Sequence, residues 1–298
     1  MGREVLMAAA AALLVAALLV VGVSAHGRKG LVCTKELKED GCNKTISDLF
    51  TVQTFEDMFK HRNDRAAHAA GFWTYDGFMA AAQMFEKDGF ASVGGDDMQK
   101  RELAAFFAHV AHETSCGWSM AKDGPTAWGL CYNQELAPMK DYCKTGDLLY
   151  PCAPGAGYYG RGAFPLYWNY NYGPTGKALK QDLLHHPEIL AQNETIAWQA
   201  AIWYWMTPAK TRPSPHEVMI GKWVPTKNDT LANRKPGFGM TINIKASDVE
   251  CGHGDDPRML SRISHYLDFL QNKFQVQDPG ANLDCGLQGV VPLAYASI

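Results

Sequence analysis

Apolar residues recur every three or four positions in several stretches of the chain, the period expected of one face of an α-helix. The side chains that begin these stretches can cap a helix N-terminus. The expected starting positions are Thr54, Thr74, Asp97, Ser214 and Asp256. Ser214 and Asp256 are each followed by proline, which suits the first position of a helix. Few stretches alternate apolar and polar residues as strands would, so the pattern predicts a mainly α-helical fold.

The helix expected to start at Asp97 would place His112 and Glu113 at its C-terminal end. Segments rich in glycine, proline and tyrosine lie between the helices, notably 117–176 and 221–256. Loops of that length in a compact domain are usually functional. No internal repeat or low-complexity linker divides the chain after its N-terminal region, so we expect one large domain.

The N-terminal region contains an uncharged apolar run, residues 5–23, followed by small residues up to Ala25. This arrangement predicts a secretory signal peptide over residues 1–25. The alternative is an uncleaved anchor, because the run is nearly long enough to span a bilayer. Arg28 and Lys29 after the run argue against an anchor with its N-terminus inside the cell. In either case the rest of the chain enters the secretory lumen, where disulfides persist.

Sequons and cysteines agree with a secretory compartment. The three Asn-x-Thr sequons begin at Asn43, Asn193 and Asn228. Eight cysteines without a C-x-x-C pair indicate disulfides and not a structural metal site. Eight cysteines allow 105 pairings. Short loops favour Cys33 with Cys42 and Cys143 with Cys152.

The overall composition narrows the class of partner. Of 298 residues, 20% are charged and 47% are hydrophobic, and the net charge is −3. Such a chain can bury a large core, which excludes a disordered protein. It also lacks the basic surplus of a fold that binds nucleic acid, so we expect no nucleic-acid partner.

Glu113 is a candidate general acid. It stands in His112-Glu113-Thr114, but a zinc protease needs His-Glu-x-x-His, and Cys116 occupies the place of the second histidine. A buried glutamate beside aromatic groups would have its pKa raised by desolvation, which suits a general acid near neutral pH. The alternative is a glutamate that only caps the helix or pairs with a cation.

Glu135, on a later loop, is a candidate for the second carboxylate that glycosidases use to activate water or attack the sugar. The segment 158–172 is dense in aromatic residues, which either stack on sugars in a groove or pack in the core. Trp198, Trp203 and Trp205 lie on an apolar stretch and are expected in the core.

Ten short motifs along the chain point to one family. They include His112-Glu113-Thr114, Ala127-Trp128-Gly129 and Trp205-Met206-Thr207-Pro208. The other motifs occupy 61–64, 71–76, 100–102, 151–155, 169–173, 236–239 and 251–254. In this order they resemble the plant class of glycoside hydrolase family 19 chitinases, from about residue 50 to residue 286.

The resemblance implies a mainly α, lysozyme-like, two-lobed fold with long loops, braced by disulfides. It also implies a cleft for β-1,4-linked N-acetylglucosamine polymers and inverting hydrolysis without a metal or other cofactor. Residues 26–49 would be an N-terminal extension with Cys33 and Cys42. Residues 50–286 would form the catalytic domain, and 287–298 a C-terminal tail.

Several residues match family positions with known roles. The resemblance implies that Glu113 is the general acid and Glu135 the general base. Arg262 matches the arginine that interacts with this acidic pair. The supporting or substrate-binding positions are His112, Glu250, Tyr170 and Asn171. The pairings Cys143–Cys152 and Cys251–Cys285 also follow the family.

Three substitutions depart from the pattern of active family members. Pro165 replaces a substrate-binding glutamine, Tyr167 replaces a serine that helps hold the nucleophilic water, and Ala246 replaces a sugar-binding asparagine. A bulky phenol at position 167 would displace the water, and losing one such positioned contact costs on the order of 10²-fold in rate. The usual partner of Cys131 is missing, its position being Ala67, which leaves a Cys116–Cys131 bridge as the expectation.

These departures resemble the plant chitinase-like subgroup, which is associated with cell-wall assembly and cellulose organisation. We therefore expect a secreted, monomeric cell-wall glycoprotein that binds β-1,4-linked polysaccharide, either chitin oligomers or glucan, with weak or no hydrolysis. The alternative is an active inverting endochitinase acting in chitin catabolism and defence. A membrane would be a partner only if residues 5–23 stayed attached.

Overall fold

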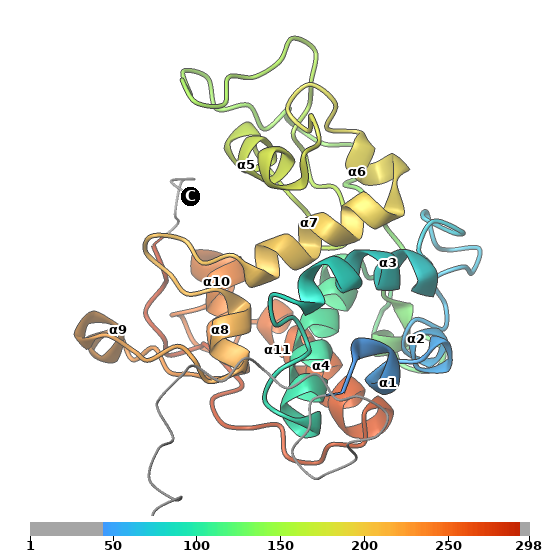
Figure 1. Cartoon of the computed structure of the whole chain (residues 1–298), viewed down its shortest axis with the longest axis vertical. Helices are drawn as coiled ribbons and strands as arrows, with labels where there is room; N and C mark the ends of the chain where they lie inside the picture. Colours follow the sequence, from blue (N-terminus) through green and yellow to red (C-terminus); the bar gives the residue numbers. More distant parts are fainter. Residues whose placement is uncertain (1–43, 293–298) are drawn as a thin grey trace, which may run out of the picture. The chain divides into compact units, whose positions relative to one another are not determined.

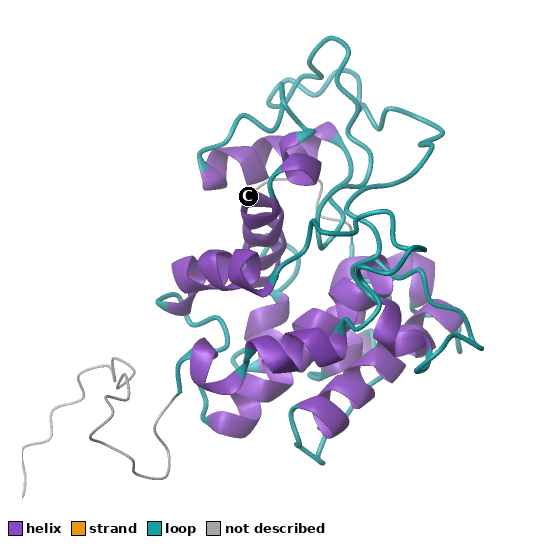
Figure 2. Cartoon of the chain, turned by 90° about the vertical axis from the view of Figure 1, so that its right-hand side faces the viewer, coloured by secondary structure: helices purple, strands orange, loops and turns teal. Residues whose placement is uncertain are grey.

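The computed structural model describes residues 44–292. Within this range the regular secondary structure is helical and no β-strand is formed (Figure 2). The only β-type pairing in these residues consists of isolated bridges, such as the one between Gln134 and Arg161. The prediction of a mainly α-helical fold is confirmed. The predicted signal peptide, the Cys33–Cys42 pair and the Asn43 sequon lie outside the described residues.

The α-helices are labelled in chain order in Figure 1, and the chain also contains a 3-10 helix, η1, and a π-helix, η2. Their bounds are α1 Ile46–Leu49, α2 Val52–Met58, α3 Tyr75–Glu86, α4 Asp96–Glu113, η1 Pro125–Trp128, α5 Asn169–Leu179, α6 Ile189–Gln192, α7 Glu194–Met206, α8 Pro215–Met219, α9 Lys227–Leu231, α10 Phe238–Glu250, α11 Pro257–Asp268 and η2 Phe269–Lys273.

Three of the expected helix starts are capped as predicted. The side chain of Thr74 accepts from the Gly77 amide, Ser214 forms a capping box with Glu217, and Asp256 accepts from the Arg258 amide. Two starts were misplaced. α2 begins after Thr51, which accepts from the Thr54 amide, and α4 begins after Gly95, which has no capping side chain.

Two segments expected to be loops contain helices. Segment 221–256 includes α9 and all of α10, and the C-terminal end of 117–176 includes most of α5. α10 starts after Gly237, whose φ of 141° is accessible mainly to glycine, and no polar side chain caps it. Phe238 and Ile242 are fully buried on α10. Tertiary packing thus forms a helix for which the local sequence gives weak signals.

The main apolar core surrounds α4, which packs against α11 (Figure 1). The ring of Phe107 lies 4.7 Å from that of Phe50 and 4.8 Å from that of Phe78, measured between centroids. Burying one such ring stabilises the fold by roughly 1.5–3 kcal/mol. Trp198 and Trp205 are fully buried, as predicted, whereas Trp203 is only half-buried.

A second apolar cluster forms where the aromatic segment 158–172 packs on α5, α6 and α7. Tyr158 and Tyr172 are fully buried in it. Tyr167 and Tyr170 are half-buried and line cavities. The segment therefore serves both of the functions considered for it, core packing and the lining of a hollow.

Disulfides brace the long loops. The structure joins Cys116 to Cys131, Cys143 to Cys152 and Cys251 to Cys285, the three pairings expected within residues 44–292. Asn193 and Asn228 are exposed at the surface. None of the helices in the described range is both long and apolar enough to cross a bilayer.

Candidate functional site

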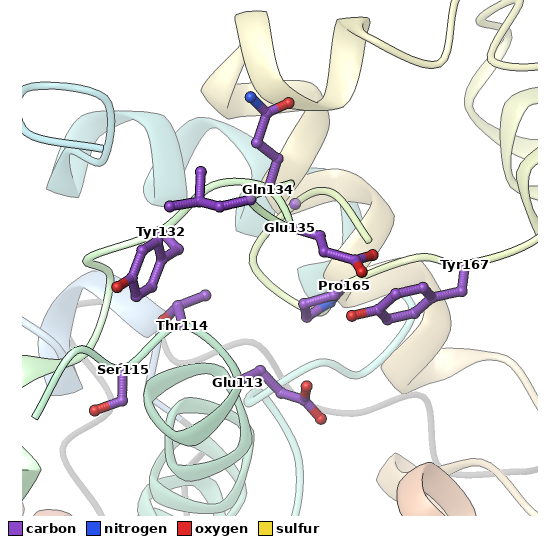
Figure 3. Close-up of a pocket in the computed structure, with 10 residues that line it drawn as sticks. Glu113, Thr114, Ser115, Tyr132, Gln134, Glu135, Pro165 and Tyr167 are labelled. Carbon is purple, nitrogen blue, oxygen red and sulfur yellow. The ribbon is translucent and has the colours of Figure 1, made fainter. Parts of the chain in front are cut away.

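Glu113 and Glu135 line the same cavity, which has a volume of about 330 Å³ (Figure 3). Glu113 is the last residue of α4, and Glu135 lies on the loop that follows η1. Pro165 and Tyr167 reach the cavity from the loop before α5. In Figure 3 the hydroxyl end of Tyr167 points between the two carboxylates. The structure thus brings together four of the residues singled out in the sequence.

Backbone contacts and one phenol hold Glu135 in place. The Glu135 amide donates to the Gly160 carbonyl at 2.7 Å, and the Gly160 amide donates to Glu135 Oε2 at 3.3 Å. The Tyr142 hydroxyl donates to Glu135 Oε1 at 3.0 Å. This carboxylate therefore has a fixed orientation although it lies on a loop.

Arg262 of α11 links Glu113 to a second, deeper carboxylate. Its Nη2 donates to Glu113 Oε1 at 2.7 Å, and its Nε and Nη2 each donate to the Glu250 carboxylate at 2.8 Å. The Arg262 side chain is 3% exposed, as is that of Glu250. Burial of the guanidinium opposes its charge, but the two carboxylates outweigh that effect and raise the pKa of Arg262. Arg262 is therefore a permanent cation in this site.

His109 lies one turn before Glu113 on α4 and was not singled out in the sequence. It forms a hydrogen bond with Arg262. Arg262 Nη1 donates to His109 Nδ1 at 3.1 Å, and His109 Nε2 lies 2.9 Å from Thr241 Oγ1. Because Thr241 donates its own proton to the Phe238 carbonyl, it accepts from His109. Burial, together with Arg262, lowers the pKa of His109 well below its usual value. The imidazole is thus neutral, with its proton on Nε2.

Lys245 is a second cation beside Glu113 that sequence reasoning missed. Its Nζ lies 3.8 Å from Glu113 Oε1 and donates to the Pro165 carbonyl at 3.2 Å. The side chain is 11% exposed. The available signal was Lys245 itself, which follows seven uncharged residues, 238–244, at the start of α10.

The expected rise in the pKa of Glu113 is wrong. Burial of this carboxyl does favour its neutral form, but Lys245 and Arg262 outweigh burial and hold the pKa of Glu113 well below its usual range. Glu113 therefore pairs with cations, which is the alternative that the sequence left open. At neutral pH it carries no proton to donate.

Replacing Lys245 by methionine is expected to raise the pKa of Glu113, because the variant lacks a cation that stabilises the carboxylate. The measurement is a ¹³C NMR titration of the glutamate carboxyl groups, with the Glu113 signal assigned by its loss in Glu113→Gln. Lys177→Met on the exposed surface of α5 is the matched control and leaves the titration unchanged. An unchanged Glu113 titration in Lys245→Met would contradict this account of the site.

Tyr167 lines the cavity beside the two carboxylates, with its hydroxyl end directed between them. Its ring lies 5.1 Å from that of Tyr142 between centroids and packs over the backbone of Gly160. A Cβ at position 160 would come within 2.5 Å of the Tyr167 hydroxyl, so a larger residue there would displace the phenol ring. Burial and the nearby Glu113 and Glu135 carboxylates raise the pKa of Tyr167, which keeps its hydroxyl neutral.

The remaining predicted site residues lie around this cavity and not in its lining. His112 is a neutral support, with Nδ1 2.9 Å from the Ser261 hydroxyl and with its pKa lowered to about 3 by burial and by Arg262. Tyr170 and Asn171 line a second cavity instead. Ala246, on α10, is half-buried and lines neither cavity.

Metal chemistry gains no support from side-chain clustering. In residues 44–292 no group of three or more His, Cys, Asp or Glu side chains is placed to hold a metal ion.

A family model described as Chitinase class I, of glycoside hydrolase family 19, matches residues 49–285. Chitinase-like protein 1 of Arabidopsis thaliana is 55% identical over 231 residues, which are 77% of this chain and 72% of that protein. An Endochitinase of Pisum sativum is 47% identical over 243 residues, covering 82% and 74% of the two chains. Similarity thus extends both to an endochitinase and to a chitinase-like protein.

The fold also matches a solved structure. The class IV family 19 chitinase from Zea mays superposes with a TM-score of 0.58 at 32% sequence identity. The superposition covers 78% of this chain and 98% of that one. The lysozyme-like fold expected from the motifs is therefore confirmed.

Proposed function

The chain belongs to the class I chitinase family of glycoside hydrolase family 19, and on that basis we propose that it binds β-1,4-linked cell-wall polysaccharide with weak or no hydrolysis. The observation that carries this proposal is the position of Tyr167, which lines the cavity with Glu113 and Glu135 and whose hydroxyl end points between the two carboxylates. The polymer would be chitin-type oligomers or glucan, and the role would be in cell-wall and cellulose organisation.

An inverting hydrolase needs a protonated acid on one side of the sugar and a water molecule held by a base on the other. Lys245 and Arg262 keep Glu113 in its charged form, so the acid lacks its proton. The Tyr167 hydroxyl points between the carboxylates, toward the space beside Glu135 in which a water would be activated. Both requirements for hydrolysis are thus weakened by groups that belong to this chain.

Binding a sugar needs neither the proton nor the water. Tyr132 and Gln134 line the cavity beside the carboxylates and offer a ring face and an amide. Aromatic faces and positioned polar groups are the usual means of holding a neutral sugar. The cavity can therefore retain recognition after losing catalysis.

The proposal also places the protein outside the cell, with residues 1–25 as the signal peptide and 50–286 as the carbohydrate-binding domain. Three disulfides within the described range and two exposed sequons, at Asn193 and Asn228, support that placement.

Chitin hexasaccharide is expected to bind to the wild type and to Glu113→Gln with affinities within about tenfold of each other, or 1.4 kcal/mol. The reason is that glutamine keeps the oxygen that accepts from Arg262. Calorimetry measures the binding, and NMR follows the release and the anomeric form of any product. Rapid release of α-anomers that Glu113→Gln abolishes would overturn the proposal, and so would the absence of binding to any chitin or cellulose oligomer.

The second candidate function is an active inverting endochitinase. The observation that favours it is that both carboxylates of the expected acid and base line one cavity. In that case Glu113 would protonate the glycosidic oxygen and Glu135 would activate water. The product analysis described for the hexasaccharide separates the two functions.

A further inference from the structure

A second cavity of about 140 Å³ lies on the other side of Pro165 and Tyr167, which line both hollows. Tyr204, Arg212 and Lys245 line this second cavity, and no aspartate or glutamate among residues 44–292 does. It is smaller than the 300–1,000 Å³ typical of pockets for drug-sized ligands, so it suits a single group on a longer chain. Its lining is cationic without an acidic counterpart.

Arg212 has only neutral partners. Its Nη1 donates to the Tyr204 hydroxyl at 3.0 Å and to the Ile244 carbonyl at 3.3 Å. Throughout residues 44–292, no carboxylate forms an ion pair with this guanidinium, and no acceptor meets its Nε or Nη2. That edge of a guanidinium presents two parallel N–H groups, the geometry that binds a carboxylate in a bidentate manner.

Lys245 brings a second positive charge to the same place. Its Nζ lies 5.7 Å from the centroid of the Tyr204 ring, and the Arg212 guanidinium carbon lies 5.0 Å from the same centroid. Two cations near the same ring repel each other. The carboxylate of Glu113, which lines the first cavity, lies 3.8 Å from Lys245. A negative group in the cavity would offset this repulsion.

We propose that the second cavity binds the carboxylate of an acidic sugar, so that the polysaccharide recognised by this chain carries uronic acid units. The inference rests on the proposed function, because it assumes that a β-1,4-linked polymer occupies the adjoining cavity. One unit would lie beside Glu113 and Glu135, and the acidic unit would cross Pro165 and Tyr167 to reach Arg212. A neutral chitin or cellulose unit would leave Arg212 without a counter-charge and Lys245 with Glu113 alone.

The test uses two tetramers that differ only at C6 of each ring. Cellotetraose carries neutral CH₂OH groups, whereas the β-1,4-linked glucuronic acid tetramer carries carboxylates on the same backbone. By calorimetry with the full secreted chain, the acidic tetramer is expected to bind at least about tenfold more tightly, or 1.4 kcal/mol. This preference should fall as salt is raised, because the pair is partly exposed to solvent.

Matched variants locate the effect. Arg212→Gln is expected to abolish the preference for the acidic tetramer, and Arg212→Lys to keep part of it, since lysine retains the charge without the bidentate edge. Lys177→Gln removes an exposed cation elsewhere and should leave the preference intact. Thermal unfolding of each variant confirms that it folds. Free glucuronic acid tests whether the carboxylate alone suffices, and it should bind more weakly than the tetramer.

The outcomes separate this inference from the proposed function. Equal binding of the two tetramers, or a preference that survives Arg212→Gln, overturns the acidic-sugar inference. If chitin tetramer still binds in that case, the proposed function stands alone. If only the acidic tetramer binds and neither chitin nor cellulose does, the acidic site stands, and the proposed recognition of neutral polymers fails.

Discussion

Tyr167→Ser combined with Pro165→Gln is expected to raise the rate of chitin hexasaccharide cleavage by about tenfold or more over the wild type. The serine removes the phenol from between Glu113 and Glu135 and leaves room for a water beside Glu135. Adding Lys245→Met should increase the gain toward the order of 10²-fold, because it favours the protonated form of Glu113 that a general acid needs.

The control for this prediction keeps the bulk of the ring. Tyr167→Phe with Pro165→Gln removes the hydroxyl but still fills the space, so it should show no gain. Product release measured by chromatography and the anomeric form measured by NMR give the rate and the stereochemistry. If the serine variant stays as inactive as the phenylalanine variant, displacement of water by Tyr167 does not explain the weak hydrolysis that we propose.

Arg262→Met is expected to destabilise the fold by about 3–5 kcal/mol at pH 7. It leaves Glu250, 3% exposed, without either of its two bonds from Arg262, and it removes the donor to His109 Nδ1. Lys60→Met is the control. The side chains of Lys60 and its partner Asp123 are 56% and 33% exposed, and exposed pairs contribute only about 0–1 kcal/mol.

The loss in Arg262→Met should depend on pH in a defined direction. The folded-state pKa of Glu113 in the wild type is lowered, so its pairing stabilises the fold above the unfolded pKa of about 4.3 and is lost as the pH falls. In the variant, acid instead neutralises the carboxylates that lack a partner. Urea unfolding should therefore show a smaller difference from wild type at pH 4 than at pH 7. A difference that is equal at both pH values would contradict the pairing.

Local signals predicted much of the fold, because caps and apolar periods are properties of neighbouring residues. Thr74, Ser214 and Asp256 each begin a helix where expected. α5 was missed because it carries Pro174 and starts after Trp168, which has a φ of 73°. Its first turn is anchored from outside the helix, since the Asn169 side chain accepts from the Lys144 amide and donates to the Tyr150 carbonyl.

The site shows the same division between local and distant information. Motifs located Glu113, Glu135 and Tyr167, and the structure places all three around one cavity. The direction of the pKa shift of Glu113 was wrong because it depends on Lys245, which belongs to a helix that local signals did not reveal. Apolar neighbours in the sequence predict that a side chain is buried. The charges that surround a buried carboxyl group come from distant segments, so they depend on the tertiary fold.

The wall shared by the two cavities couples two properties that enzyme engineering usually tries to vary separately. Pro165 and Tyr167 line both hollows, and Lys245 lines the second while contacting Glu113 of the first. Substituting Pro165 or Tyr167 to enlarge the first cavity therefore also changes the shape of the second. Substituting Lys245 to raise the pKa of Glu113 also removes a positive charge from the second cavity. Under the proposals made above, selection for faster cleavage at these three positions would alter the ligand preference of the second cavity in the same step.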